Sequence, residues 1–160
     1  MRSLNKVGVL AVLLVVLSMG LIAPAVSALP ESCTGPFTIG VSNSFVGSEW
    51  RTQMVQNIED VVAEYNTQGV QVELVVESAD TDVPGQQQQI QNLVNRGVNA
   101  IIINPGDVSG LNLDLEDAAS QGIVVIAVDQ EIGAQGVYNV VIDQTEWARI
   151  SARWLVHELG

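Results

Sequence analysis

Short apolar runs alternate five times with segments of helical periodicity, and this alternation constrains the fold of the 160-residue chain more than any other feature. The apolar runs cover residues 37–43, 70–77, 99–104, 123–128 and 137–142. Runs of this kind are typical of strands that are covered on both faces of a parallel sheet. We therefore predict an α/β fold, with a doubly wound, parallel, five-stranded sheet in the order 2-1-3-4-5 that is flanked by helices.

Capping residues and glycines bound the expected helices. The expected N-caps are Ser48, Asp82 with Pro84 in the first turn, Ser109, and Asp143 with Glu146 three residues later. Residues 66–69, Gly97 and Gly122 end the first three helices. Apolar residues at three- and four-residue steps from Trp50 to Tyr65 give the first helix one apolar stripe. Trp147, Ile150, Trp154 and Leu155 predict a buried side for the last helix.

Residues 1–28 have the pattern of a signal peptide. Arg2 and Lys6 precede an apolar stretch over residues 7–17, and small residues end the segment at Ala28. We expect cleavage after Ala28 and export to the periplasm or the cell exterior. The alternative is an uncleaved anchor, because residues 7–26 are nearly uncharged and close to the ~20 residues of a membrane span.

The segment after the signal peptide, Leu29 to Pro36, is expected to be a flexible leader. It contains Cys33, the only cysteine, which therefore has no partner for an internal disulfide. Lipid attachment at Cys33 is disfavoured by the Pro-Glu-Ser sequence before it. We expect neither a metal nor a cofactor.

The charge of the processed chain excludes one class of partner. Four arginines and no lysine stand against 18 acidic residues after residue 28, which gives a formal charge of −14. Such a surface repels phosphate backbones, so we expect no nucleic-acid binding.

Polar side chains follow the predicted strands at the edge of the sheet where ligands bind in open α/β folds. The candidate ligand-binding residues at this edge are Ser44, Ser48, Trp50, Arg51, Asn104, Asp129, Gln130 and Asp143. Carboxylates accept hydroxyl hydrogen bonds, Arg and Asn donate them, and an indole face covers the apolar side of a sugar ring. The mixture favours a neutral polyhydroxyl ligand.

Several of these residues also have a structural explanation. Trp50 lies on the apolar stripe of its helix, and Arg51 could be a solvated surface residue. Asp129 and Asn104 suit turns, and Asp143 suits a helix cap. The sequence alone leaves both interpretations open.

An enzymatic function has little support in the sequence. His157 is the only histidine and lies near a helix end, and no nucleophile elbow or phosphate-binding glycine loop is present. Asp129 and Asp143 could form a carboxylate pair as in a secreted hydrolase, although nothing in their spacing requires it. We expect a protein that is not an enzyme.

Four blocks of the chain resemble the periplasmic (type I) sugar-binding proteins of ABC importers. Within the ribose-binding-like group, the resemblance is to the subgroup that takes galactofuranose and related sugars. The matching blocks, in order, are IGVSNSFVGSEWR, VNRGVNAIIINP, GIVVIAVDQ and IDQTEWARISARWLV. The sequence departs from the family at Gln130, Gln144 and Ala148, where the family usually has Arg, Asn and Gly.

The resemblance implies a solute-binding component that holds a monosaccharide between two lobes and delivers it to an ABC permease. Trp50, Arg51 and Asp129 would contact a pentose, hexose or furanose. Residues 37–160 would form the first lobe and the second lobe would be missing from a truncated chain, whereas the full-length protein would be a monomer. An extracellular sensor that hands its sugar to a receptor has the same sequence features.

Overall fold

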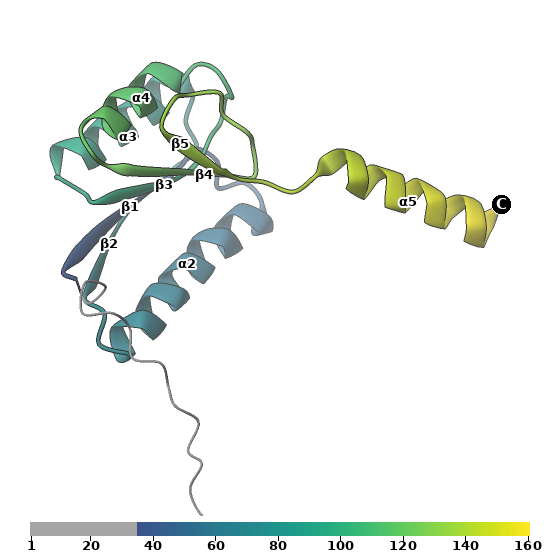
Figure 1. Ribbon diagram of the computed structural model, residues 1–160, viewed down its shortest axis with the longest axis horizontal. Coiled ribbons are helices and arrows are strands. Elements are labelled where there is room, and N and C mark those ends of the chain that lie inside the picture. The colour runs from purple at the N-terminus through teal and green to yellow at the C-terminus, as the bar shows by residue number, and fades with distance from the viewer. Residues whose placement is uncertain (1–34) are drawn as a thin grey trace, which may run out of the picture. The chain divides into compact units, whose positions relative to one another are not determined.

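The sheet has five parallel strands in the order β2-β1-β3-β4-β5, in a computed structural model that describes residues 35–160 (Figure 1). The strands are β1 (Phe37–Asn43), β2 (Val72–Ser78), β3 (Ala100–Asn104), β4 (Val124–Val128) and β5 (Val137–Val140). The predicted fold class and strand order are confirmed. The predicted signal peptide, Cys33 and most of the predicted leader lie outside the described residues.

The register of the parallel strands brings their polar ends together. Asn43 at the end of β1 lies opposite Ser78 of β2 on one side and Asn104 of β3 on the other. Three polar residues therefore meet in the middle of the sheet at its carboxyl edge, the edge at which open α/β sheets bind ligands.

Helices cover the two faces of the sheet unequally. The described helices are α2 (Glu49–Thr67), α3 (Val83–Asn95), α4 (Asn112–Ser120) and α5 (Gln144–Leu159). Figure 1 shows α2 on one face and both α3 and α4 on the other. The buried core lies on the α3 and α4 face, and its large members are Ile90, Leu93, Ile101, Ile103, Leu111, Leu115, Val125 and Ile132.

Local signals account for most helix ends. The side chains of Ser48, Asp82 and Asp143 accept N–H bonds in the first turns of α2, α3 and α5, as predicted. Gly97 has a φ of +71° directly after the end of α3, a conformation that glycine adopts without strain. The prediction that Ser109 caps α4 is wrong, because Leu111 holds that position with no side-chain bond.

The predicted buried side of the last helix is also wrong. No residue of α5 is buried, and Trp147, Ile150, Trp154 and Leu155 are each at least half exposed. The amphipathic pattern correctly predicts a helix, but no surface among residues 35–160 buries its apolar side. In Figure 1, α5 covers neither face of the sheet.

None of the helices over residues 35–160 combines the length and the apolar composition that a membrane crossing requires.

Candidate functional site

Arg51 joins three elements at the carboxyl edge of the sheet. It lies in the first turn of α2, and its Nη1 donates to Oδ1 of Asn43 at 3.2 Å. Its Nη2 lies 3.9 Å from Oδ2 of Asp129, which directly follows β4. The Arg51 side chain is only 12 % exposed and that of Asp129 is 32 % exposed, so this ion pair is partly shielded from water.

Burial and charge act on Arg51 in opposite directions. Burial lowers the pKa of Arg51 from its ordinary value, whereas the nearby Asp129 carboxylate opposes this shift. Arginine stays protonated in proteins, and its five N–H donors exceed the two contacts that the structure gives to the guanidinium head. Arg51 therefore retains donors for the hydroxyl groups of a ligand.

Asn43 is held in one orientation by its neighbours. Its Nδ2 donates to the carbonyl of Phe45 at 2.8 Å and to Oγ of Ser78 at 2.9 Å. Its Oδ1 is thereby directed to Arg51. The sequence placed Asn43 at the correct edge, yet it was not singled out as a site residue. Its position as the last residue of an apolar strand is the signal that could have identified it.

Trp50 is not a core residue. Its side chain is 54 % exposed, which excludes the core-packing explanation. The Cζ atom of Arg51 lies 5.8 Å from the centroid of its ring, within the range of a cation–π contact. An exposed indole beside a guanidinium group offers an apolar face next to hydrogen-bond donors.

Asp129 has an unusual backbone conformation. Its φ is +73°, and it is the one non-glycine residue with a positive φ over residues 35–160. Its N–H donates to the carbonyl of Val140 on β5. Left-handed residues other than glycine concentrate at functional sites, where the surrounding structure holds them. The conformation is compatible with a turn or with ligand binding, the two alternatives that the sequence left open.

Other candidates are engaged in structural bonds. Oγ of Ser48 caps α2, and Oδ1 of Asp143 accepts the N–H of Glu146 at 2.8 Å. Nε2 of Gln130 donates to the carbonyl of Pro105 at 3.0 Å. Ser44 is 6 % exposed. Ser48, Gln130 and Asp143 thus have structural roles in this structure, and Ser44 is buried.

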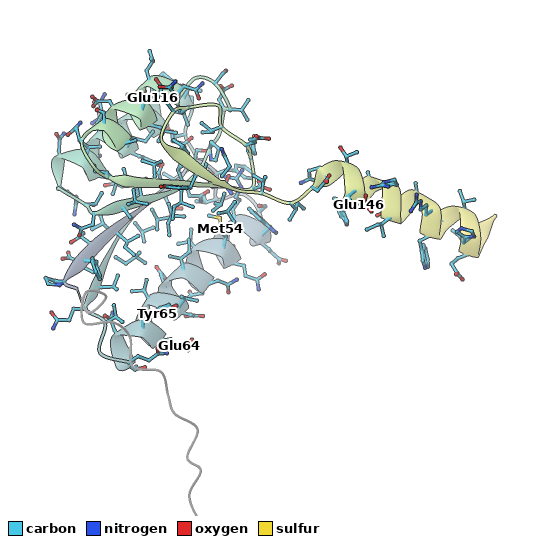
Figure 2. All side chains as sticks on the ribbon, viewed as in Figure 1. Met54, Glu64, Tyr65, Glu116 and Glu146 are labelled. Carbon is cyan, nitrogen blue, oxygen red and sulfur yellow. The ribbon has the colours of Figure 1, made fainter. Side chains whose placement is uncertain are left out.

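Asn104 is buried and incompletely paired. It is fully inaccessible, its Oδ1 has no hydrogen-bond partner, and its Nδ2 makes a 3.5 Å contact with Sδ of Met54. Figure 2 shows Met54 where α2 approaches the sheet. A buried acceptor without a partner is uncommon in folded proteins.

Two buried glutamines of α3 form hydrogen bonds with the ends of β1 and β3. Gln86 donates to Oγ of Ser42 and to the carbonyl of Asn104, and its Oε1 accepts the N–H of Gly106 at 2.8 Å. Gln89 accepts from Oγ of Ser42 at 2.8 Å. Neither residue was singled out from the sequence. Their spacing is the signal that could have identified them, because Gln86 lies four residues before Ile90 and Gln89 four residues before Leu93.

Loops after β1 and β2 are tied to each other. Oδ1 of Asp80 accepts the N–H of Val46 at 2.8 Å, and the N–H of Thr81 donates to the carbonyl of Ser44. The loop that leads from Asn43 to Arg51 is therefore held to the loop after β2 at Ser44 and Val46. Among the residues the structure describes, no group of three or more His, Cys, Asp and Glu side chains is arranged to hold a metal ion.

Comparison with known proteins assigns the chain to a family. The sequence profile described as a periplasmic binding protein domain matches residues 39–160. The chain belongs to the periplasmic binding protein family. This confirms the resemblance inferred from the sequence, and the family is one of sugar-binding proteins typical of ABC transport systems.

Individual relatives of this periplasmic binding protein are sugar-binding proteins. The ribose import binding protein of Bacillus subtilis is 27 % identical over 125 residues, which are 78 % of this chain and 39 % of the relative. The crystal structure of a galactofuranose binding protein has a TM-score of 0.65 and 26 % identity, over 78 % of this chain and 42 % of that chain. The fructose binding periplasmic domain of a hybrid two-component system has a TM-score of 0.66 and 26 % identity, over 77 % and 40 %. The chain thus spans about two fifths of the length of these relatives.

Proposed function

We propose that this periplasmic binding protein supplies one lobe of the solute-binding component of an ABC importer. The lobe contacts a monosaccharide, which is a pentose, a hexose or a furanose, and the loaded protein delivers it to a membrane permease. The single observation that carries the proposal is the partly buried contact of Arg51 with Asn43 and Asp129 at the carboxyl edge of the sheet.

The chemistry of this contact suits a neutral sugar. Arg51 donates, Asp129 accepts, and the exposed Trp50 ring lies beside the guanidinium group. Because Arg51 and Asp129 carry opposite charges that balance each other, the pair does not require a charged ligand. Hydrogen bonds to charged groups contribute about 1.5–3 kcal/mol each, so a few of them give useful affinity.

We further propose that residues 37–160 are one of two lobes that close on the ligand, and that the other contacts come from the second lobe. The coverage of about two fifths of each relative supports this proposal. A single lobe leaves its ligand open to water on one side, so we expect weak binding by the lobe alone.

Nuclear magnetic resonance titration of the purified protein with ribose, xylose and galactose tests the proposal. We expect one of these sugars to shift the Arg51 Nε–H and Trp50 indole N–H signals in a saturable manner. In Arg51→Lys the shift of Trp50 should weaken, because lysine lacks the planar fork of donors. The matched control is Arg96→Lys, which changes an exposed arginine at the end of α3. The absence of any saturable shift with the panel would contradict the proposal.

Sensing is a second candidate function. The likeness to the periplasmic domain of a two-component system supports it, because that domain binds fructose within a signalling protein. The two functions share the same ligand site, so binding experiments do not separate them. Neighbouring genes separate them: adjacent permease and ATPase genes support import, whereas an adjacent receptor gene supports sensing.

The hydrolase alternative gains no support, since Asp143 is engaged as a helix cap and Asp129 contacts Arg51.

A further inference from the structure

Asp129 is the central residue of a tight turn at the end of β4. The N–H of Gln130 donates to the carbonyl of Val128 at 2.9 Å, and Asp129 between them has a φ of +73°. A bond between residues two positions apart, across a residue with a φ of about +75°, is that of a γ-turn, and this form of it is rare and strained. Such a conformation persists only where the surrounding structure holds it.

The direction of the Asp129 carboxylate depends on this turn. Its Oδ2 lies 3.9 Å from Nη2 of Arg51. The Cβ atom rotates about the N–Cα bond as φ changes, so a return to the negative φ of ordinary L-residues would direct the carboxylate away from Arg51. The ion pair at the ligand site therefore requires the strained turn to stay closed.

Asn139 of β5 binds the chain three residues after Asp129. Its Oδ1 accepts the N–H of Ile132, and its Nδ2 donates to the carbonyl of Ile132, both at 2.9 Å. An amide side chain can make both bonds because it carries a donor and an acceptor on one carbon. The two bonds fix both polar backbone groups of Ile132. Asn139 was not among the residues singled out from the sequence.

Ile132 is also held by the core. Asn139 pairs in register with Ala127 of β4, which is a core residue. Residues in register on parallel strands lie on the same face of the sheet, so Asn139 is on the core side. Ile132 is 2 % exposed and belongs to the same core. The far end of the turn is therefore anchored both by hydrogen bonds and by apolar packing.

The near end of the turn is bonded to the next residue of β5. The N–H of Asp129 donates to the carbonyl of Val140 at 3.2 Å. The side chain of Gln130 adds a bond to the carbonyl of Pro105 at 3.0 Å, in the loop after β3. Residues 129–132 are thus joined to β5 at both ends, through Val140 at one end and Asn139 at the other.

We propose that Asn139 is a positioning residue of the ligand site. Its bonds to Ile132 keep the γ-turn at Asp129 closed and so direct the Asp129 carboxylate to Arg51 and to the ligand. Asn139 acts through the backbone of the turn and does not contact the ligand. The role of this residue in sugar binding rests on the proposed function, whereas its effect on the contact between Asp129 and Arg51 needs no ligand.

The guanidinium N–H signals of Arg51, followed by nuclear magnetic resonance, test the proposal. In Asn139→Ala both bonds to Ile132 are lost, and we expect the Arg51 signals to move towards their positions in Asp129→Asn, which lacks the charge. For a sugar of the ribose, xylose and galactose panel that binds, the Kd should rise about tenfold, the factor for a turn that is closed about one tenth of the time.

A second variant guards against loss of the fold. Threonine favours strands and lacks the amide, so Asn139→Thr should keep β5 while removing the paired bonds. We expect it to move the Arg51 signals in the same direction as Asn139→Ala.

Asn66→Ala is the matched control, because Asn66 makes the same pair of bonds elsewhere. Its Nδ2 donates to the carbonyl of Val72 at 3.0 Å, and its Oδ1 accepts the N–H of Val72 at 2.8 Å. Val72 begins β2 and therefore lies at the opposite edge of the sheet from the ligand site. We expect a similar loss of stability in urea, with the Arg51 signals and the sugar affinity unchanged.

Two results would overturn the positioning role: Arg51 signals that stay in place in a folded Asn139 variant, or an equal shift in Asn66→Ala. A wild-type protein that binds no sugar of the panel would contradict the proposed function instead. The Arg51 signals would still decide the role of Asn139 in that case, so the two failures are distinguishable.

Discussion

The guanidinium group of Arg51 lies 3.9 Å from the carboxylate of Asp129 and links the first turn of α2 to the end of β4. The two residues are far apart in the sequence, and Asn43 of β1 completes the contact at 3.2 Å. Oppositely charged side chains that are partly buried gain more from each other than exposed pairs do. The contact therefore fixes a donor and an acceptor side by side at the sheet edge.

The positive φ of Asp129 predicts an unusual order of stability among its variants. Asp129→Gly and Asp129→Ala both remove the carboxylate, but only alanine keeps a Cβ atom at a φ of +73°. We expect the alanine variant to be less stable than the glycine variant by about 1–2 kcal/mol. Urea unfolding of the two variants measures the difference. Equal stabilities would show that the left-handed conformation relaxes without cost.

The buried amide of Gln86 predicts a large loss of stability on substitution. Gln86→Leu removes the partners of Ser42, of the Asn104 carbonyl and of the Gly106 N–H together. Unpaired buried polar groups cost about 1–3 kcal/mol, so we expect a loss of that size in the free energy of unfolding. The control is Gln88→Leu, since Gln88 is exposed and bonds only to Asn92. A loss no larger than that of the control would contradict the importance of the buried amide.

Gly106 approaches Ser44 too closely for any side chain. A Cβ atom on residue 106 would lie 2.6 Å from Oγ of Ser44. We expect Gly106→Ala to destabilise the fold by about 1–3 kcal/mol through overpacking. Adding Ser44→Ala removes the clashing oxygen and should recover part of the loss, which a double-mutant cycle of unfolding free energies would detect. Gly133→Ala is the control, because a Cβ there meets no atom within 4 Å.

The loop before α4 should depend on pH through Asp107. The Gly110 N–H, the Ser109 N–H and the Ser109 hydroxyl all donate to its carboxylate, and these bonds lower the pKa of Asp107 below 3.8. A lowered folded-state pKa means that the stabilisation is present above the unfolded pKa and is lost as the pH falls through the folded value. The amide signals of Ser109 and Gly110 should therefore shift with a midpoint below 3.8.

The same titration of Asp107→Asn serves as the control. Its amide signals should show no such midpoint, because the side chain no longer ionises. A midpoint at or above 3.8 in the wild-type protein would contradict the bonding seen at this loop.

The sequence by itself determined the fold class, the strand order and most element ends of this protein. These features follow from local patterns: apolar runs for strands, three- and four-residue spacing for helices, and caps such as Ser48, Asp82 and Asp143. Neighbours along the chain make these contacts, so the pattern of residues is sufficient. The sequence also placed Arg51 and Asp129 at one edge, because parallel strands end together.

Only the tertiary structure decided which side chains meet at that edge and which apolar side chains remain exposed. The bonds of Gln86 and Gln89 to Ser42 join residues more than 40 positions apart, so helical spacing can place both glutamines on the buried side of α3 but does not specify their partner. Trp147 and Trp154 are the opposite case, because their spacing predicts a buried side of α5 but both are more than half exposed. Periodicity gives a helix an apolar side, but the surface that buries it depends on where the link after β5 directs the chain.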